Sequence, residues 1–133
     1  MKNIILFFSS LLVLSVGFAD NFVLINQTSH PANNKKSKIV LQWASSVAQV
    51  EESNNTIKQG KKLNPHTLQV LARVGKFNLE SPQNAKYFRV LVWSKGVKKP
   101  DLLTNWVDII PNKTYTLTDN HLIPMALMSG MGC

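Results

Sequence analysis

The sequence of 133 residues contains a single cysteine, Cys133, so no disulfide bond can form within one chain. Exported domains of this size from animals and plants often depend on two or more disulfides. The shortage of cysteine therefore favours a bacterial protein. Three Asn-x-Thr motifs, at Asn26, Asn54 and Asn112, would be glycosylation sites in a eukaryotic secretory pathway but ordinarily have no role in a bacterium.

Familiar catalytic motifs are also missing. The chain has no Gly-x-Ser-x-Gly, His-Glu-x-x-His or Cys-x-x-Cys motif and no glycine-rich phosphate loop. Its seven acidic residues stand singly apart from Glu51 and Glu52, and neighbours in an extended segment point to opposite faces. We therefore expect a protein that is not an enzyme. A small secreted hydrolase or an enzyme inhibitor stays open as a further alternative.

The first 19 residues have the pattern of a secretory signal peptide. Lys2 precedes an uncharged apolar run over residues 4–16, and small residues at positions 17 and 19 precede a cleavage site after Ala19. The run is shorter than the ~20 apolar residues that a membrane-spanning helix needs. We expect residues 1–19 to be removed and residues 20–133 to form one domain without a transmembrane span, in the periplasm or secreted.

No long helical stripe is present in the mature chain, whereas apolar residues recur mostly with a period of two. Short alternating runs separated by proline, glycine and polar clusters are typical of half-buried strands. They predict an all-β fold, a mostly antiparallel β-sandwich or barrel, with an immunoglobulin-like sandwich as the first choice. The predicted strands cover residues 22–26, 38–48, 68–74, 76–79, 86–93, 103–110, 114–118 and 122–128.

The alternation of residues along the predicted strands also predicts which face two tryptophans occupy. Trp43 shares one face of its predicted strand with other apolar residues, Val47 included, so it is expected in the core. Trp106 shares its face with Thr104 and Asp108, which indicates a partly polar surface where a ligand or partner would stack. Gly75 separates two runs of alternation, and either a bend within one long strand or two separate strands would fit.

The charge of the mature chain is strongly positive. Without Lys2 it has 14 basic and 7 acidic residues, a net charge of about +7 with neutral histidines. This balance favours an anionic partner, such as lipid headgroups, lipopolysaccharide or acidic glycans, and export disfavours nucleic acid. Nine lysines form three clusters in predicted loops: Lys35, Lys36 and Lys38; Lys58, Lys61 and Lys62; Lys95, Lys98 and Lys99.

These clusters suggest a binding function. Loops of a sandwich gather at its two ends, so two clusters are expected to meet and form one anion-binding surface. Trp93 and Trp106 flank the third cluster and would supply stacking for a base or a sugar ring. The alternative interpretation is that the lysine-rich loops are simply solvated.

All sulfur beyond the initiator methionine lies near the end of the chain, in Met125, Met128, Met131 and Cys133. Soft sulfur ligands select Cu(I), so these residues with His121 offer an alternative function as a periplasmic copper-binding protein. Cys133 by itself is a candidate for an intermolecular disulfide, giving a covalent dimer or a link to an envelope protein. A further alternative is that this C-terminal segment pairs as an extra strand with the edge of another subunit's sheet. The leading interpretation has no cofactor and lets residues 122–128 complete the sheet.

Overall fold

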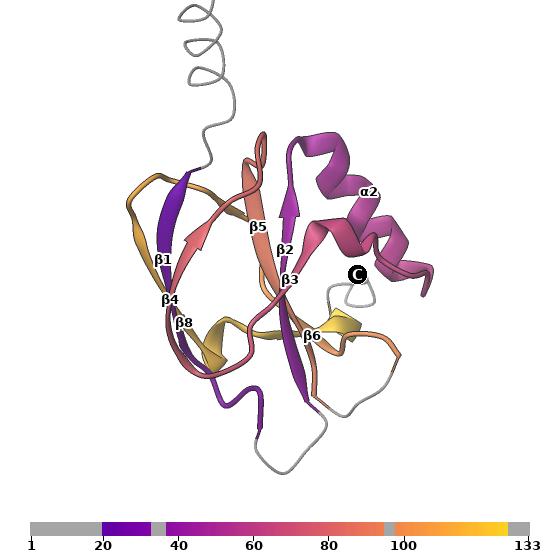
Figure 1. Cartoon of the computed structure of the whole chain (residues 1–133). Coiled ribbons are helices and arrows are strands. Elements are labelled where there is room, and N and C mark those ends of the chain that lie inside the picture. Colours follow the sequence, from indigo (N-terminus) through magenta and orange to yellow (C-terminus); the bar gives the residue numbers. More distant parts are fainter. Residues whose placement is uncertain (1–19, 33–36, 95–97, 128–133) are drawn as a thin grey trace, which may run out of the picture.

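The computed structural model describes residues 20–32, 37–94 and 98–127. Within these ranges the chain forms nine strands and one α-helix, and the strands build two sheets that pack face to face (Figure 1). The prediction of a small, mostly antiparallel β-sandwich is confirmed. The expected signal peptide, residues 1–19, lies outside the described ranges. In the part of the chain that is described, no helix is long and apolar enough to span a membrane.

The smaller sheet has three strands in the order β4-β1-β8. The central strand β1 (Asn21–Gln27) is antiparallel to β4 (Gly75–Glu80) and parallel to β8 (Thr114–Thr118). Gly75 begins β4 with a φ of 114°, a conformation that residues with a Cβ rarely adopt. The preceding strand belongs to the other sheet, so Gly75 stands where the chain has passed from one sheet to the other.

The larger sheet is organised around two long strands. β2 (Lys38–Ala44) and β5 (Tyr87–Trp93) pair antiparallel over seven residues, from Lys38 opposite Trp93 to Ala44 opposite Tyr87. The remaining strands of this sheet are short, and all of its pairings are antiparallel: β3 (Leu68–Val70), β6 (Leu102–Leu103), β7 (Val107–Asp108) and β9 (Ile123–Pro124).

An aromatic cluster joins the two sheets. Phe22 on β1 stacks on Phe88 of β5, with ring centroids 5.3 Å apart, and meets Trp43 of β2 and Tyr115 of β8 edge to face. Phe22, Phe88 and Trp43 are each at most 5% exposed. Trp43 therefore lies in the core, as predicted. Aliphatic residues from both sheets complete this cluster: Leu24, Ile39, Leu41, Leu71, Leu79, Val90, Val92 and Leu117.

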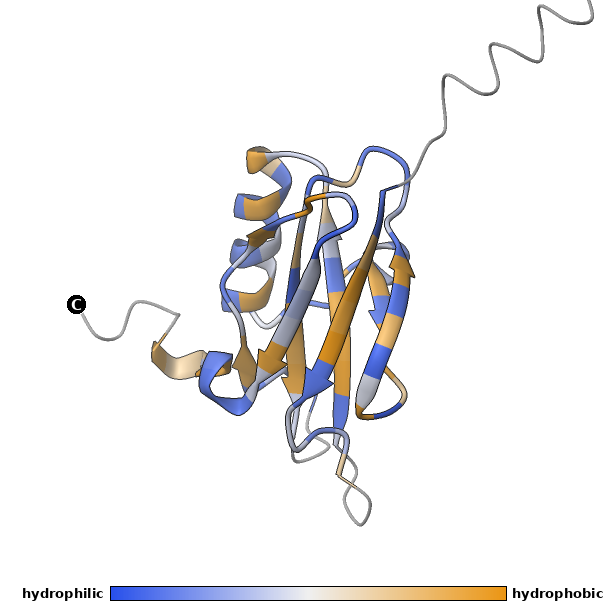
Figure 2. Cartoon of the chain, turned by 90° about the vertical axis from the view of Figure 1, so that its left-hand side faces the viewer, coloured by the Kyte–Doolittle hydropathy of each residue, from blue (hydrophilic) through white to orange (hydrophobic). Residues whose placement is uncertain are grey.

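The larger sheet is also covered on its other side. Helix α2 (Val47–Lys58) lies against the face that points away from the smaller sheet, so the domain has three layers (Figure 1). Ile57 of the helix packs with Leu91 and Leu103 in a second apolar cluster. Figure 2 shows apolar residues alternating along the strands, while polar residues make up much of the helix. Because both faces of β2 are covered, six of its seven residues are buried.

Helix α2 corrects the predicted strand over residues 38–48. The strand ends at Ala44, and Ser46 caps the helix by accepting a hydrogen bond from the Gln49 backbone N–H at 3.1 Å. The Gln49 side chain accepts one in turn from the Ser45 N–H at 2.8 Å. This serine and glutamine spacing is a helix-start signal, and it competes with alternation for the same residues. Val47, expected in the core, begins the helix and is 60% exposed.

Three other predicted strands are too long. The segment over residues 68–74 is a strand only up to Val70. Of the segment over residues 122–128, the structure describes residues up to 127, and among these only Ile123–Pro124 form a strand. The segment over residues 103–110 is broken between β6 and β7. There the Thr104 hydroxyl accepts a hydrogen bond from the Val90 N–H at 2.9 Å, so a side chain replaces a carbonyl of the strand ladder.

A buried amide holds two loops beside β1. The side chain of Asn26 is fully buried; its oxygen accepts hydrogen bonds from the N–H and the hydroxyl of Thr28, at 3.1 and 2.6 Å. Its amide nitrogen donates to the carbonyls of His30 and Arg73, at 2.9 and 3.1 Å. The Asn26 motif is therefore closed to a glycan in the folded protein, because its nitrogen is already engaged.

We expect Asn26→Asp to lower the free energy of unfolding at neutral pH by about 2 kcal/mol, because carboxylate oxygens replace an amide that donates to two buried carbonyls. The substitution changes shape very little, so the loss reports hydrogen bonding. Urea denaturation measures it, with Asn78→Asp at an exposed position of β4 as the control. Equal stability of the two variants would show that the Asn26 contacts do not hold the loops.

Candidate anion-binding surface

The end of helix α2 positions the second lysine cluster. Gly60 follows the helix with a φ of 70°, its N–H donates to the Ile57 carbonyl at 2.9 Å, and the Lys61 N–H donates to the Thr56 carbonyl at 3.0 Å. This pair of bonds is a Schellman motif, which ends the helix sharply and needs a residue that tolerates left-handed backbone. The turn fixes the backbone from which Lys61 and Lys62 project into solvent.

The third cluster lies directly against this turn. A Cβ added to Gly60 would come within 2.9 Å of Cε and 3.1 Å of Nζ of Lys99, so the end of the Lys99 side chain rests on the glycine. The side chains of Lys99 and its neighbour Lys98 are exposed. Loops that are 40 residues apart in the sequence thus bring the second and third clusters together.

The first cluster joins the same region through Trp93. The ammonium group of Lys38, at the start of β2, lies 4.7 Å from the centre of the Trp93 ring at the end of β5. The indole N–H of Trp93 donates to the Lys98 carbonyl at 3.1 Å. Trp93 therefore links the first cluster to the third, and Lys38 occupies one of its ring faces.

We call this region the basic end. It consists of six exposed lysines from all three clusters, carried by the start of β2, the end of α2 and the loop after β5 (Figure 1): Lys38, Lys58, Lys61, Lys62, Lys98 and Lys99. The other three lysines of the predicted surface, Lys35, Lys36 and Lys95, lie outside the described residues. Asp101 is the acidic residue nearest to Lys98 and Lys99 in the sequence. Its carboxylate accepts hydrogen bonds from the N–H and the hydroxyl of Ser94.

Trp106 lies elsewhere in the structure. Its ring stacks on the guanidinium of Arg89, at 4.4 Å from the centroid, and its indole N–H donates to the Asn54 side-chain oxygen at 3.2 Å. Arg89 and Trp93 are four residues apart on β5, which is about 13 Å along a strand. Trp106 therefore does not lie beside the third cluster; together with Lys58 and other residues it lines a small pocket under helix α2.

Two residues of the proposed copper tail are described, and both already have contacts. The Nδ1 atom of His121 accepts a hydrogen bond from the Thr118 N–H at 3.0 Å. Met125 packs against the apolar cluster of Ile57, Leu91 and Leu103. A copper ion at Nδ1 of His121 would have to displace the Thr118 N–H.

The rest of the sulfur tail, Met128, Met131 and Cys133, lies outside the described residues, and so does the proposed intermolecular disulfide. In residues 20–32, 37–94 and 98–127, no three side chains of histidine, cysteine, aspartate or glutamate come close enough to hold a metal ion. Copper binding and cross-linking through the tail therefore stay predictions from the sequence.

Fold and surface together define a small β-sandwich with a lysine-rich end. No protein family and no curated protein matches the chain. Among solved structures, Lip of Serratia marcescens, a membrane-bound component of the type VI secretion system, is similar with a TM-score of 0.44 and 12% sequence identity. The aligned region covers 79% of this chain and 96% of that chain. A likeness of this degree carries no argument about function.

Proposed function

We propose that this chain is an exported, non-enzymatic binding protein of the bacterial envelope or culture fluid, and that the basic end contacts an anionic surface or an anionic protein partner. The observation that supports this most strongly is the convergence of the three lysine clusters. Residues up to 61 positions apart in the sequence, Lys38 and Lys99, belong to one exposed region. Simple solvation of loops does not require such clustering.

The structure of the basic end also suits a charged surface physically. Its lysines project from a tight turn and from short loops, and the Trp93 ring and Gly60 hold two of them in place. Each lysine near an anionic membrane contributes about 1 kcal/mol of attraction, so six of them together contribute about 6 kcal/mol, enough for reversible association. The attraction is long-ranged only where salt is scarce, because the Debye length falls from about 30 Å at 0.01 M to about 8 Å at 0.15 M.

The salt dependence of binding tests this proposal. We expect the mature protein to sediment with vesicles that contain phosphatidylglycerol at low ionic strength, and to be released progressively as sodium chloride approaches physiological concentration. Vesicles of phosphatidylcholine alone are the control and should not bind. A protein that ignores anionic vesicles and acidic glycans at low salt, or binds them equally at every salt concentration, would contradict an electrostatic surface.

A further inference from the structure

Arg89 is a buried cation with no acidic partner in the described part of the chain. Its side chain is 2% exposed, and burial lowers the pKa of its guanidinium to about 10, so the group stays charged at neutral pH. Nε donates to the Gln42 side-chain oxygen at 2.7 Å, and Nη1 donates to the Asn54 side-chain oxygen at 2.8 Å. Both acceptors are neutral amides. The third nitrogen, Nη2, has no hydrogen-bond partner among the described residues.

A buried arginine is ordinarily neutralised by a carboxylate or a phosphate, because the desolvation of its charge is otherwise uncompensated. Here the Trp106 ring covers one face of the guanidinium and supplies only a cation–π contact. Among the described residues, the charge therefore has no acidic partner and the two N–H groups of Nη2 have no acceptor. This is the arrangement expected when the missing acceptor belongs to a ligand.

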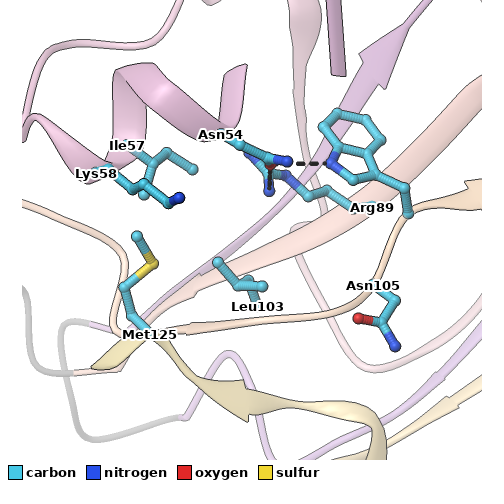
Figure 3. Close-up of a pocket in the computed structure, with 8 residues that line it drawn as sticks. Asn54, Ile57, Lys58, Arg89, Leu103, Asn105 and Met125 are labelled. Carbon is cyan, nitrogen blue, oxygen red and sulfur yellow. Dashed lines mark hydrogen bonds between the residues drawn. The ribbon is translucent and has the colours of Figure 1, made fainter. Parts of the chain in front are cut away.

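Arg89 lines a cavity of about 130 Å³ between helix α2 and the larger sheet. Figure 3 shows Asn54 and Lys58 descending from the helix on one side, with Leu103, Asn105 and Met125 on the opposite side. The walls differ in chemistry: Asn54, Arg89, Asn105 and Trp106 are polar or carry an N–H, whereas Ile57, Leu103 and Met125 are apolar. The ammonium-bearing side chain of Lys58 is exposed and adds positive charge at the cavity.

We propose that this cavity binds a carboxylate group that carries a short apolar substituent. The charges of Arg89 and Lys58 attract the carboxylate, which accepts from Nη2 of Arg89 once the side chains that bury this atom shift, while the substituent packs against Ile57, Leu103 and Met125. Drug-sized ligands occupy pockets of roughly 300–1,000 Å³, so a cavity of about 130 Å³ takes only such a small group. Phosphate fits less well because its four oxygens need more donors than one free guanidinium nitrogen and the amides supply. The cavity shares Lys58 with the basic end, whereas Arg89 lies outside that region.

The carboxylate has two possible sources, a free short-chain acid or the end of a peptide, and a titration separates them. The nuclear magnetic resonance signal of the Trp106 indole N–H is followed while pentanoate, N-acetyl-leucine, pentanamide or inorganic phosphate is added in the millimolar range. We expect a saturable shift with a carboxylate and affinity for pentanamide at least tenfold weaker than for pentanoate, because a charged hydrogen bond is lost. Tighter binding of pentanoate would identify a free short-chain acid as the source, and tighter binding of N-acetyl-leucine would identify the end of a peptide. Equal binding of pentanoate and pentanamide, or no binding by either carboxylate, would overturn the proposal.

Two variants locate the effect. Arg89→Gln should lower pentanoate affinity at least tenfold, but it also alters buried hydrogen bonds to Gln42 and Asn54 and its folding has to be verified. Met125→Trp leaves these bonds in place and fills the cavity, so it should abolish binding. Val70→Trp, at a position of β3 that is 59% exposed, is the matched control and should bind normally. Unchanged binding by folded Met125→Trp would place the ligand elsewhere.

Discussion

Reversing the charge of two neighbouring lysines at the basic end, Lys61→Glu with Lys62→Glu, is expected to weaken association with anionic vesicles about a thousandfold at low salt. Removal of two charges near an anionic surface costs about 2 kcal/mol, and replacement by negative charges about doubles the loss. A loss of about 4 kcal/mol corresponds to about three powers of ten in affinity. Both side chains are exposed beyond the end of helix α2, so the fold should survive.

A matched variant separates local charge from total charge. Lys86→Glu with Lys113→Glu changes the net charge by the same amount, but both lysines lie at the opposite end of the sandwich. The Lys86 N–H donates to the Ala44 carbonyl at the end of the β2–β5 ladder that is far from Lys38 and Trp93. The Ile109 N–H donates to the Lys86 carbonyl, so the segment that leads to Lys113 lies at the same end. That ladder is about 20 Å long, which exceeds the Debye length at 0.1 M salt. Equal losses in the two variants would argue against a defined surface.

Phe22→Ala is expected to lower the free energy of unfolding by about 3–5 kcal/mol, the largest stability effect we anticipate. Its ring contacts Trp43, Phe88 and Tyr115, and so joins four strands from both sheets. Domains of this size are typically stable by only about 5–15 kcal/mol, so the loss threatens folding itself. Alanine would leave a cavity where the sheets meet.

Urea denaturation with an unchanged m-value measures this loss. Val70→Ala, at an exposed position of β3, is the control and should change stability by less than about 0.5 kcal/mol. A loss of less than about 1 kcal/mol in Phe22→Ala would mean that the two sheets do not depend on the aromatic cluster.

Strands β1, β4, β5 and β8 match their predicted bounds to within one residue at each end. β8 was predicted with its bounds and β1 within one residue at each end, because their apolar and polar residues alternate cleanly. Helix α2 was missed because Ile57 is its one buried residue, which leaves no apolar stripe to detect. The spacing of Ser46 and Gln49 is the one feature of the sequence that indicates a helix start here. The alternation of apolar residues continues through Val47, however, and favours a strand over the same residues.

The candidate sites, too, can be predicted from the sequence only in part. The three lysine clusters can be recognised in the sequence. Whether they lie close together depends on which ends of the strands and of helix α2 are at the same end of the domain, and only the tertiary fold determines this. The sequence does not single out Arg89, because it is a lone cation within the apolar run of β5. The signal was its spacing: Arg89 alternates with Phe88 and Val90, which places it on the face that helix α2 covers.

If the basic end is the surface that meets an anionic partner, hydrogen–deuterium exchange of the vesicle-bound protein will show it. We predict slower exchange on binding in peptides that cover residues 58–62 and 98–101. Peptides around Lys86 and Lys113, at the other end, should exchange at the same rate with and without vesicles. Protection confined to the Lys86 and Lys113 region, or spread evenly over the chain, would contradict the account.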